Sequence, residues 1–190
     1  MTNPASERQE VGGTAGLLLK IADWVDFAIG KICNFVLLVT GSVMLAILTM
    51  NVIARYIFES GGLASAQELP ERLFPVFIVA GIVIAVQRGG HLSVDTLLLS
   101  LGRTGQRILL LFMLVIVMVS YVVLVKQSLF VAKVTQIDLS PVLGIPTSYG
   151  YYALAAGCIG VILTSATIAI RVAILGPEAN PVVRSEDSPV

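Results

Sequence analysis

The fold is decided by the stretch Gln87-Arg88-Gly89-Gly90-His91-Leu92-Ser93-Val94-Asp95, which separates two long apolar halves of the chain. It is polar, contains a glycine pair and holds the single histidine of the sequence. Polar residues with paired glycines between apolar runs are typical of a loop at a membrane face. We therefore expect one hydrophobic hairpin before this stretch and a second one after it.

The composition points to a membrane protein. The chain has 190 residues, of which 56% are hydrophobic and 13% charged, and its mean hydropathy is +0.92. A soluble domain is about one quarter charged. The net charge of zero gives no case for nucleic-acid binding. Both cysteines, Cys33 and Cys158, lie in apolar runs and no metal-type spacing is present, so we expect buried thiols and no cofactor.

Outward from the central stretch, the apolar runs predict an all-α membrane domain over residues 14–175, with polar and disordered tails at 1–13 and 176–190. A membrane-spanning helix needs about 20 apolar residues. On this basis we place the spans at residues 32–54, 69–88, 108–125 and 149–170. The second is the shortest uncharged run and spans only if Arg72 and Arg88 extend their charged ends towards water.

Two further segments have helical spacing without crossing length. Leu17–Ile29 places apolar residues on one side and Lys20, Asp23 and Asp26 on another, which predicts a surface helix or a cytoplasmic extension of the first span. Val94–Leu101 predicts a short interfacial helix capped by Ser93.

Local motifs predict how the hairpins begin and turn. Ser65 and Glu68 have the spacing of a capping box at the start of the second span. The segment 140–146 (SPVLGIP) has the chemistry of a turn. Small residues at helical spacing, such as Ala153 with Gly157, permit close helix approach, either within the chain or with a partner.

Basic residues set the orientation of a membrane protein, because cytoplasmic loops carry the excess of Lys and Arg. Alternate faces of the four-span topology carry six basic residues on one side and four on the other. The larger group is Lys20, Lys31, Arg88, Arg103, Arg107 and Arg171. We therefore expect both termini and the central loop in the cytoplasm.

The apolar cores of the four expected spans contain no ionisable side chain of the types Asp, Glu, Lys, Arg or His. Pumps and coupled transporters usually hold ionisable groups inside the membrane, and a diheme anchor needs paired axial histidines. No nucleophile with an adjacent base is visible, so we do not expect an enzyme. The sequence predicts a membrane-embedded subunit that assists a partner.

Four motifs in order carry a family resemblance. They are Asn51-Val-Ile-Ala-Arg55-Tyr56, then Glu68-Leu69, then Arg88-Gly89-Gly90-His91 with Asp95, and finally the turn 140–146. On these motifs, residues 32–170 resemble the small membrane subunit of tripartite ATP-independent periplasmic (TRAP) transporters. The family often has a second arginine before the glycine pair, where this chain has Gln87.

The resemblance implies a scaffold subunit in the bacterial inner membrane with no cofactor. Its partners would be a large multi-span subunit, which imports an organic acid with sodium ions, and a periplasmic substrate-binding protein. Membrane lipids would surround it. The substrate is not encoded here, and the polar C-terminal tail favours a separate chain over a fusion.

Six polar residues near the span ends are candidates for contacts with the partner or with lipid: Asn51, Arg55, Glu68, Arg88, His91 and Asp95. Each also has a local interpretation. Arg55 has Glu59 nearby as a partner, Glu68 complements a helix dipole, and Gly89-Gly90 ends the second span.

Two other functions stay open from the residues alone. One is a membrane anchor of an oxidoreductase, which would be recognised by a heme-type spectrum. The other is a small autonomous channel, which would pass substrate through liposomes that contain only this chain.

Overall fold

The computed structural model describes residues 13–58, 64–88 and 102–177. Within them lie four helices, all long and apolar enough to cross a membrane, which confirms the all-α fold with four spans. They are α2 (Gly13–Phe58), α3 (Ala64–Gln87), α5 (Arg103–Val134) and α6 (Ser148–Leu175). The expected interfacial helix Val94–Leu101, with His91 and Asp95, lies outside the described residues.

α2 is one continuous helix of 46 residues. At 1.5 Å per residue it is about 69 Å long, more than twice the hydrocarbon thickness of about 30 Å. Of the two interpretations of Leu17–Ile29, the structure therefore shows the extension of the first span. No proline interrupts the segment, which leaves every backbone N–H available for the helical ladder.

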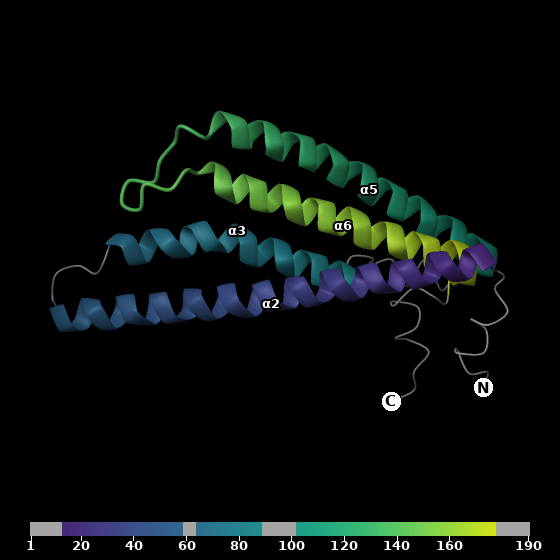
Figure 1. Cartoon of the computed structure of the whole chain (residues 1–190), viewed down its shortest axis with the longest axis horizontal. Coiled ribbons are helices and arrows are strands. Elements are labelled where there is room, and N and C mark those ends of the chain that lie inside the picture. The colour runs from purple at the N-terminus through teal and green to yellow at the C-terminus, as the bar shows by residue number, and fades with distance from the viewer. Residues whose placement is uncertain (1–12, 59–63, 89–101, 178–190) are drawn as a thin grey trace.

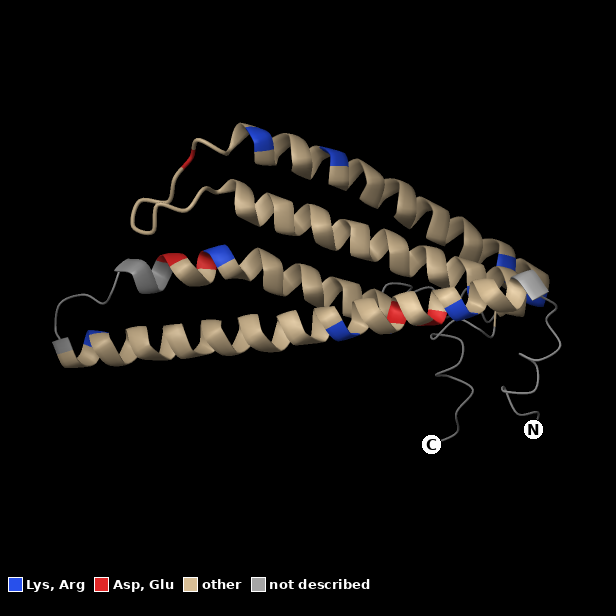
Figure 2. Cartoon of the chain, in the orientation of Figure 1, with Lys and Arg blue, Asp and Glu red and all other residues tan. Residues whose placement is uncertain are grey.

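The helices form two antiparallel hairpins that pack side by side (Figure 1). α2 lies against α3, and α5 lies against α6, while α3 and α6 join the two hairpins. Each helix has a long uncharged stretch, at residues 32–54, 73–87, 108–125 and 148–170, and the charged residues of the described helices lie outside these stretches, on the sides that face the two ends of the bundle (Figure 2). The polar contacts that fasten the helices are therefore found at these ends.

The buried core lies between α3, α5 and α6 and includes Val83, Leu110, Val161 and Val172. It is narrow, because the exposed face of α2 and much of α5 are apolar and have no partner helix within the described chain. Such a surface is expected of a protein whose solvent is lipid.

Glycines on α6 bring it close to α3. A Cβ on Gly157 would lie 1.4 Å from Val79 Cγ1, and one on Gly160 would lie 3.1 Å from Val83 Cγ2. For these two glycines the structure shows packing within the chain. Larger side chains would hold the two helices apart.

Candidate functional site

At the end of the bundle where α2 begins and α6 ends, Arg171 faces two carboxylates of α2. Its Nη2 lies 3.0 Å from Asp23 Oδ1 and 2.5 Å from Asp26 Oδ2. The side chain of Asp26 is 16% exposed and that of Asp23 is 48% exposed. Asp26 is therefore the more shielded partner and depends more on the arginine.

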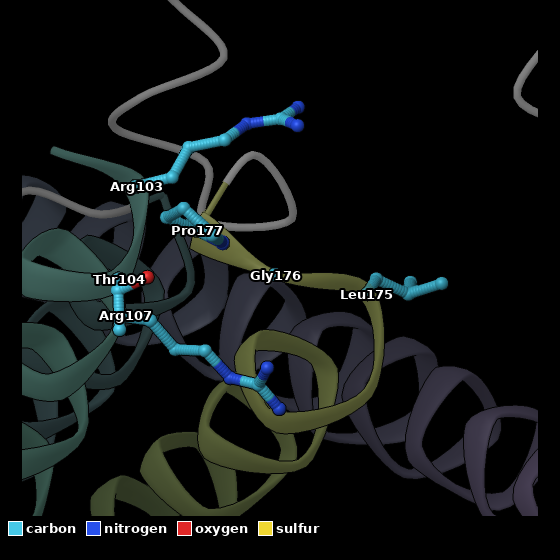
Figure 3. Close-up of a pocket in the computed structure, with 6 residues that line it drawn as sticks. All are labelled: Arg103, Thr104, Arg107, Leu175, Gly176 and Pro177. Atoms are coloured by element: carbon cyan, nitrogen blue, oxygen red, sulfur yellow. The ribbon is translucent and has the colours of Figure 1, made fainter.

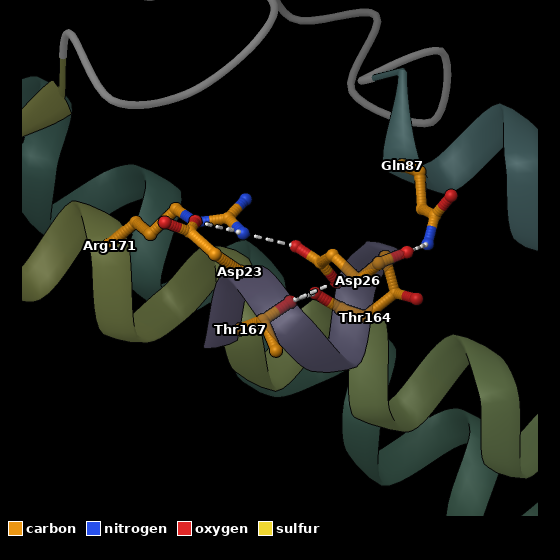
Figure 4. A network of polar contacts seen from close by, with 6 residues as sticks. All are labelled: Asp23, Asp26, Gln87, Thr164, Thr167 and Arg171. Atoms are coloured by element: carbon orange, nitrogen blue, oxygen red, sulfur yellow. Dashed lines mark hydrogen bonds and ion pairs between the residues drawn. The ribbon is translucent and has the colours of Figure 1, made fainter. Parts of the chain in front are cut away.

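Two further side chains complete this group, which we call the Arg171 cluster: Asp23, Asp26, Gln87, Thr167 and Arg171 (Figure 4). The Thr167 hydroxyl lies 2.7 Å from Asp26 Oδ1 and also 2.7 Å from the Thr164 carbonyl oxygen. Gln87 Nε2 donates to the backbone carbonyl of Asp26 at 3.0 Å. One turn of α2 is thus held by both α3 and α6.

At the opposite end, Glu68 of α3 binds the loop between α5 and α6. Its Oε2 accepts hydrogen bonds from the backbone N–H of Val142, at 3.1 Å, and of Leu143, at 2.9 Å. Glu68 is 8% exposed. One oxygen of the Glu68 carboxylate is therefore bound by donors of the same chain.

The loop that Glu68 binds contains a single helical turn, Ser140–Gly144. The Gly144 N–H donates to the Ser140 carbonyl at 3.0 Å, and Gly144 ends the turn at φ +64°, which favours glycine. The first N–H groups of a helical turn have no partner within it. Glu68 satisfies two of them from another helix, as a capping side chain ordinarily does from the same one.

This contact corrects the capping box expected at the start of the second span. α3 already includes Ser65 as its second residue, so Ser65 does not precede the helix. The Glu68 carboxylate binds Val142 and Leu143 instead. Ser65 and Glu68 have the spacing of a capping box, but the N–H groups of Val142 and Leu143 bind the Glu68 carboxylate.

The candidate residues divide between the two ends of the bundle. Asn51 is half-buried and Arg55 exposed on the last turns of α2, near the end where Glu68 begins α3. Arg88 is exposed directly after α3, at the other end. Their contacts with a partner stay predictions.

The sequence missed the Arg171 cluster, although its parts were visible. The sequence places Asp23 and Asp26 on the polar side of Leu17–Ile29, and it places Arg171 among the basic residues expected on the cytoplasmic side. No local pattern connects Arg171 with Asp23, because 148 residues separate them. Gln87 was noted only as a departure from the family. Within the described residues no group of three or more His, Cys, Asp or Glu could hold a metal ion.

A family model described as "Tripartite ATP-independent periplasmic transporters, DctQ component" matches residues 44–174. The chain belongs to this TRAP transporter family. It is the family of the small permease component, and Glu68, Gln87 and Arg171 fall within the matched region. Asp23 and Asp26 precede it, so the two carboxylates of the Arg171 cluster lie outside the matched residues.

Three relatives are similar to the chain, and two of them are described as TRAP transporter small permeases. The chain is 38% identical over 141 residues to an uncharacterized protein of Sinorhizobium fredii, covering 74% of this chain but only 26% of that one. It is 26% identical over 135 residues to a protein of Haemophilus influenzae described as a TRAP transporter small permease, covering 71% of this chain and 79% of the relative. A second Haemophilus influenzae protein of the same description is 25% identical over 155 residues, which is 82% of this chain and 91% of the relative.

Proposed function

We propose that this chain is the scaffold subunit of a sodium-coupled, binding-protein-dependent secondary transporter for an organic acid. It packs against a large transport subunit in the bacterial inner membrane and stabilises it. A periplasmic binding protein delivers the substrate to the complex. The chain itself catalyses no reaction and holds no cofactor. Family membership supports the place of the chain in a TRAP transporter.

The observation that carries the scaffold role is the distribution of polar and apolar groups. The charged residues of the described helices lie outside long uncharged stretches (Figure 2), and the exposed apolar face continues along α2, with Phe35 70% and Leu38 71% exposed. A carrier that moves ions through its own core needs polar groups there. The described helices of this chain have an apolar surface against which another membrane protein can pack.

The polar contacts at both ends support the same role, since they fix the helices relative to one another. The Arg171 cluster joins α2, α3 and α6, and Glu68 joins α3 to the loop before α6. A scaffold must hold its shape while its partner moves, and these contacts resist sliding of the helices.

The test is a tagged purification of the chain from native membranes in mild detergent, with mass spectrometry of the bound proteins. We expect a stoichiometric partner with many spans. A chain that emerges alone as a stable homo-oligomer would contradict the proposal. Uptake in proteoliposomes then checks the role. The large subunit and binding protein should need this chain for full transport, and full rate without it would also contradict the proposal.

A further inference from the structure

The part of α2 that precedes its uncharged stretch has two opposite sides. One side packs on the bundle, where Leu19 and Ala22 are only 8% and 2% exposed. On the same side the Asp26 carboxylate binds Arg171 of α6. The opposite side is exposed and has no partner helix within the described chain. This side, which we call the outer face of α2, follows the helical spacing i, i+4, i+7 and i+11 and consists of Lys20, Trp24, Phe27 and Lys31.

The outer face combines aromatic rings with positive charge. Trp24 is 72% exposed and Phe27 is 63% exposed. Lys20 and Lys31 are exposed at the two ends of the face, and the Lys31 ammonium lies 5.1 Å from the centroid of the Phe27 ring. A helix side that carries lysines together with exposed Trp and Phe is typical of contact with a lipid surface.

The carboxylates of this segment are bound on its other side. Asp23 and Asp26 are the only acidic residues between positions 14 and 31, and both bind Arg171. Lys20 and Lys31 therefore give the outer face its positive sign. The complementary partner is negatively charged and also accepts aromatic rings. The headgroup layer of a membrane that contains anionic phospholipid has both properties.

The contact between α2 and α6 fixes the depth of Trp24. The uncharged stretch of α6 ends at Ile170, and the next residue, Arg171, binds Asp23 and Asp26. Trp24 stands between these two carboxylates in the sequence, so it is level with the end of an uncharged stretch. Such an end marks the boundary between the hydrocarbon and the headgroups, which is where Trp is enriched in membrane proteins.

The outer face differs from a cavity at the same end of the bundle, where α5 begins and α6 ends (Figure 3). That cavity measures about 250 Å³ and has Arg103 and Arg107 among its lining residues. Their guanidinium groups point to opposite sides of Gly176 and Pro177, so they do not converge on one anion. The outer face of α2 requires no such convergence, because a headgroup layer offers a separate phosphate to each lysine.

We infer that the outer face of α2 binds anionic phospholipid headgroups, with Trp24 and Phe27 inserted among the lipids and Lys20 and Lys31 at the phosphate groups. The inference concerns lipid binding and is independent of the scaffold role. It predicts that an acidic lipid is enriched around Trp24 relative to a zwitterionic lipid.

The test uses the fluorescence of Trp24, which is the single tryptophan of the chain and so reports on this face alone. The full chain is reconstituted in vesicles of phosphatidylcholine and phosphatidylglycerol, in which one lipid or the other carries brominated acyl chains that quench tryptophan. At equal mole fractions we expect brominated phosphatidylglycerol to quench Trp24 more strongly than brominated phosphatidylcholine does.

Variants of the lysines test the cause of the preference. Lys20→Gln and Lys31→Gln should each lower the relative affinity for phosphatidylglycerol roughly fivefold. Lys20→Arg should retain the preference, because the charge remains. The matched control is Lys133→Gln, which removes an exposed lysine from α5 at the opposite end of the bundle. Circular dichroism of each variant separates a change of the outer face from a loss of the fold.

Three outcomes would overturn the inference. One is equal quenching of Trp24 by the two brominated lipids. Another is an equal loss of preference in Lys20→Gln and Lys133→Gln, which would mean general charge attraction. The third is a Trp24 that neither brominated lipid quenches, because the outer face would then lie in water or against protein.

Discussion

The carboxylate of Glu68 and the backbone N–H of Leu143 form a hydrogen bond of 2.9 Å across 75 residues of sequence. The bond ties the start of α3 to the loop before α6, and the neighbouring N–H of Val142 joins the same oxygen. Glu68 of the first hairpin thus caps the Ser140–Gly144 turn of the second hairpin.

Replacing Glu68 should loosen the Ser140–Gly144 turn. In Glu68→Ala two N–H groups lose a charged acceptor, so we expect their amide exchange to accelerate about tenfold or more. Hydrogen exchange of a peptide covering residues 138–147 measures this. Glu71→Ala is the matched control, because Glu71 is exposed one turn away. Equal exchange in both variants would mean that the Glu68 contact does not order the turn.

The close approach of α3 and α6 predicts a size limit at Gly157. In Gly157→Ala the new methyl group would overlap Val79, whose Cγ1 lies 1.4 Å from the added Cβ. We expect a loss of about 1–3 kcal/mol in the free energy of unfolding, measured by denaturation in detergent micelles.

A compensating change tests the cause of that loss. Val79→Ala in the background of Gly157→Ala removes the overlapping methyl groups and should restore part of the stability. Gly150→Ala is the control, since its Cβ would meet Pro75 Cγ at an ordinary 3.6 Å. If the double variant were no more stable than Gly157→Ala, the overlap would not be the reason.

Arg171 should matter more than either of its partners alone. Arg171→Gln leaves the shielded carboxylate of Asp26 without its cation, and we expect a cost of about 1–3 kcal/mol in unfolding. Asp23→Asn should cost about 1 kcal/mol or less, because Asp23 is 48% exposed. A double-mutant cycle with Asp26→Asn measures the coupling directly. A coupling near zero would show that Arg171 and Asp26 do not stabilise each other.

Gln87 is expected to position α2. Its Nε2 donates to the Asp26 carbonyl, and its Oε1 lies 2.9 Å from the place that a Cβ on Gly30 would take. Gly30→Val should therefore displace the Gln87 side chain and break the bond. A cross-link between cysteines placed on α2 and α3 near these residues should form more slowly in Gly30→Val. Gly81→Ala serves as the control, because a Cβ there would meet Leu37 Cδ1 at an ordinary 3.8 Å.

The sequence was sufficient for the helices because three of the spans are uncharged throughout and the second is uncharged from Leu73 to Val86. Long uncharged stretches have few structural alternatives in lipid. It was sufficient for the turn at 140–146 because prolines restrict the backbone there and glycine permits the positive φ that the turn needs. It could not supply the contacts between helices. Whether Asp26 meets Arg171 depends on how two helices are rotated about their axes, and this rotation follows from the packing of many small residues.

Gln87 illustrates the same limit. In the sequence, Gln87 stood out only because the family often has an arginine at this position. Its partner in the structure is the backbone carbonyl of Asp26, and every residue has such a carbonyl. No side-chain pattern identifies such an acceptor. The role of Glu68 was hidden for the same reason, since both of its donors are backbone N–H groups.

The unbroken course of α2 has a consequence for how changes of length are tolerated. α2 is held near Asp26 by Arg171, and further along Gly41 lies against Phe77 of α3. One inserted residue between these points would rotate one contact relative to the other by about 100°, so both could not form together. Seven inserted residues, close to two full turns, would nearly restore the angular phase but lengthen the helix. The segment between Asp26 and Gly41 thus works as a spacer that sets an angle as well as a length.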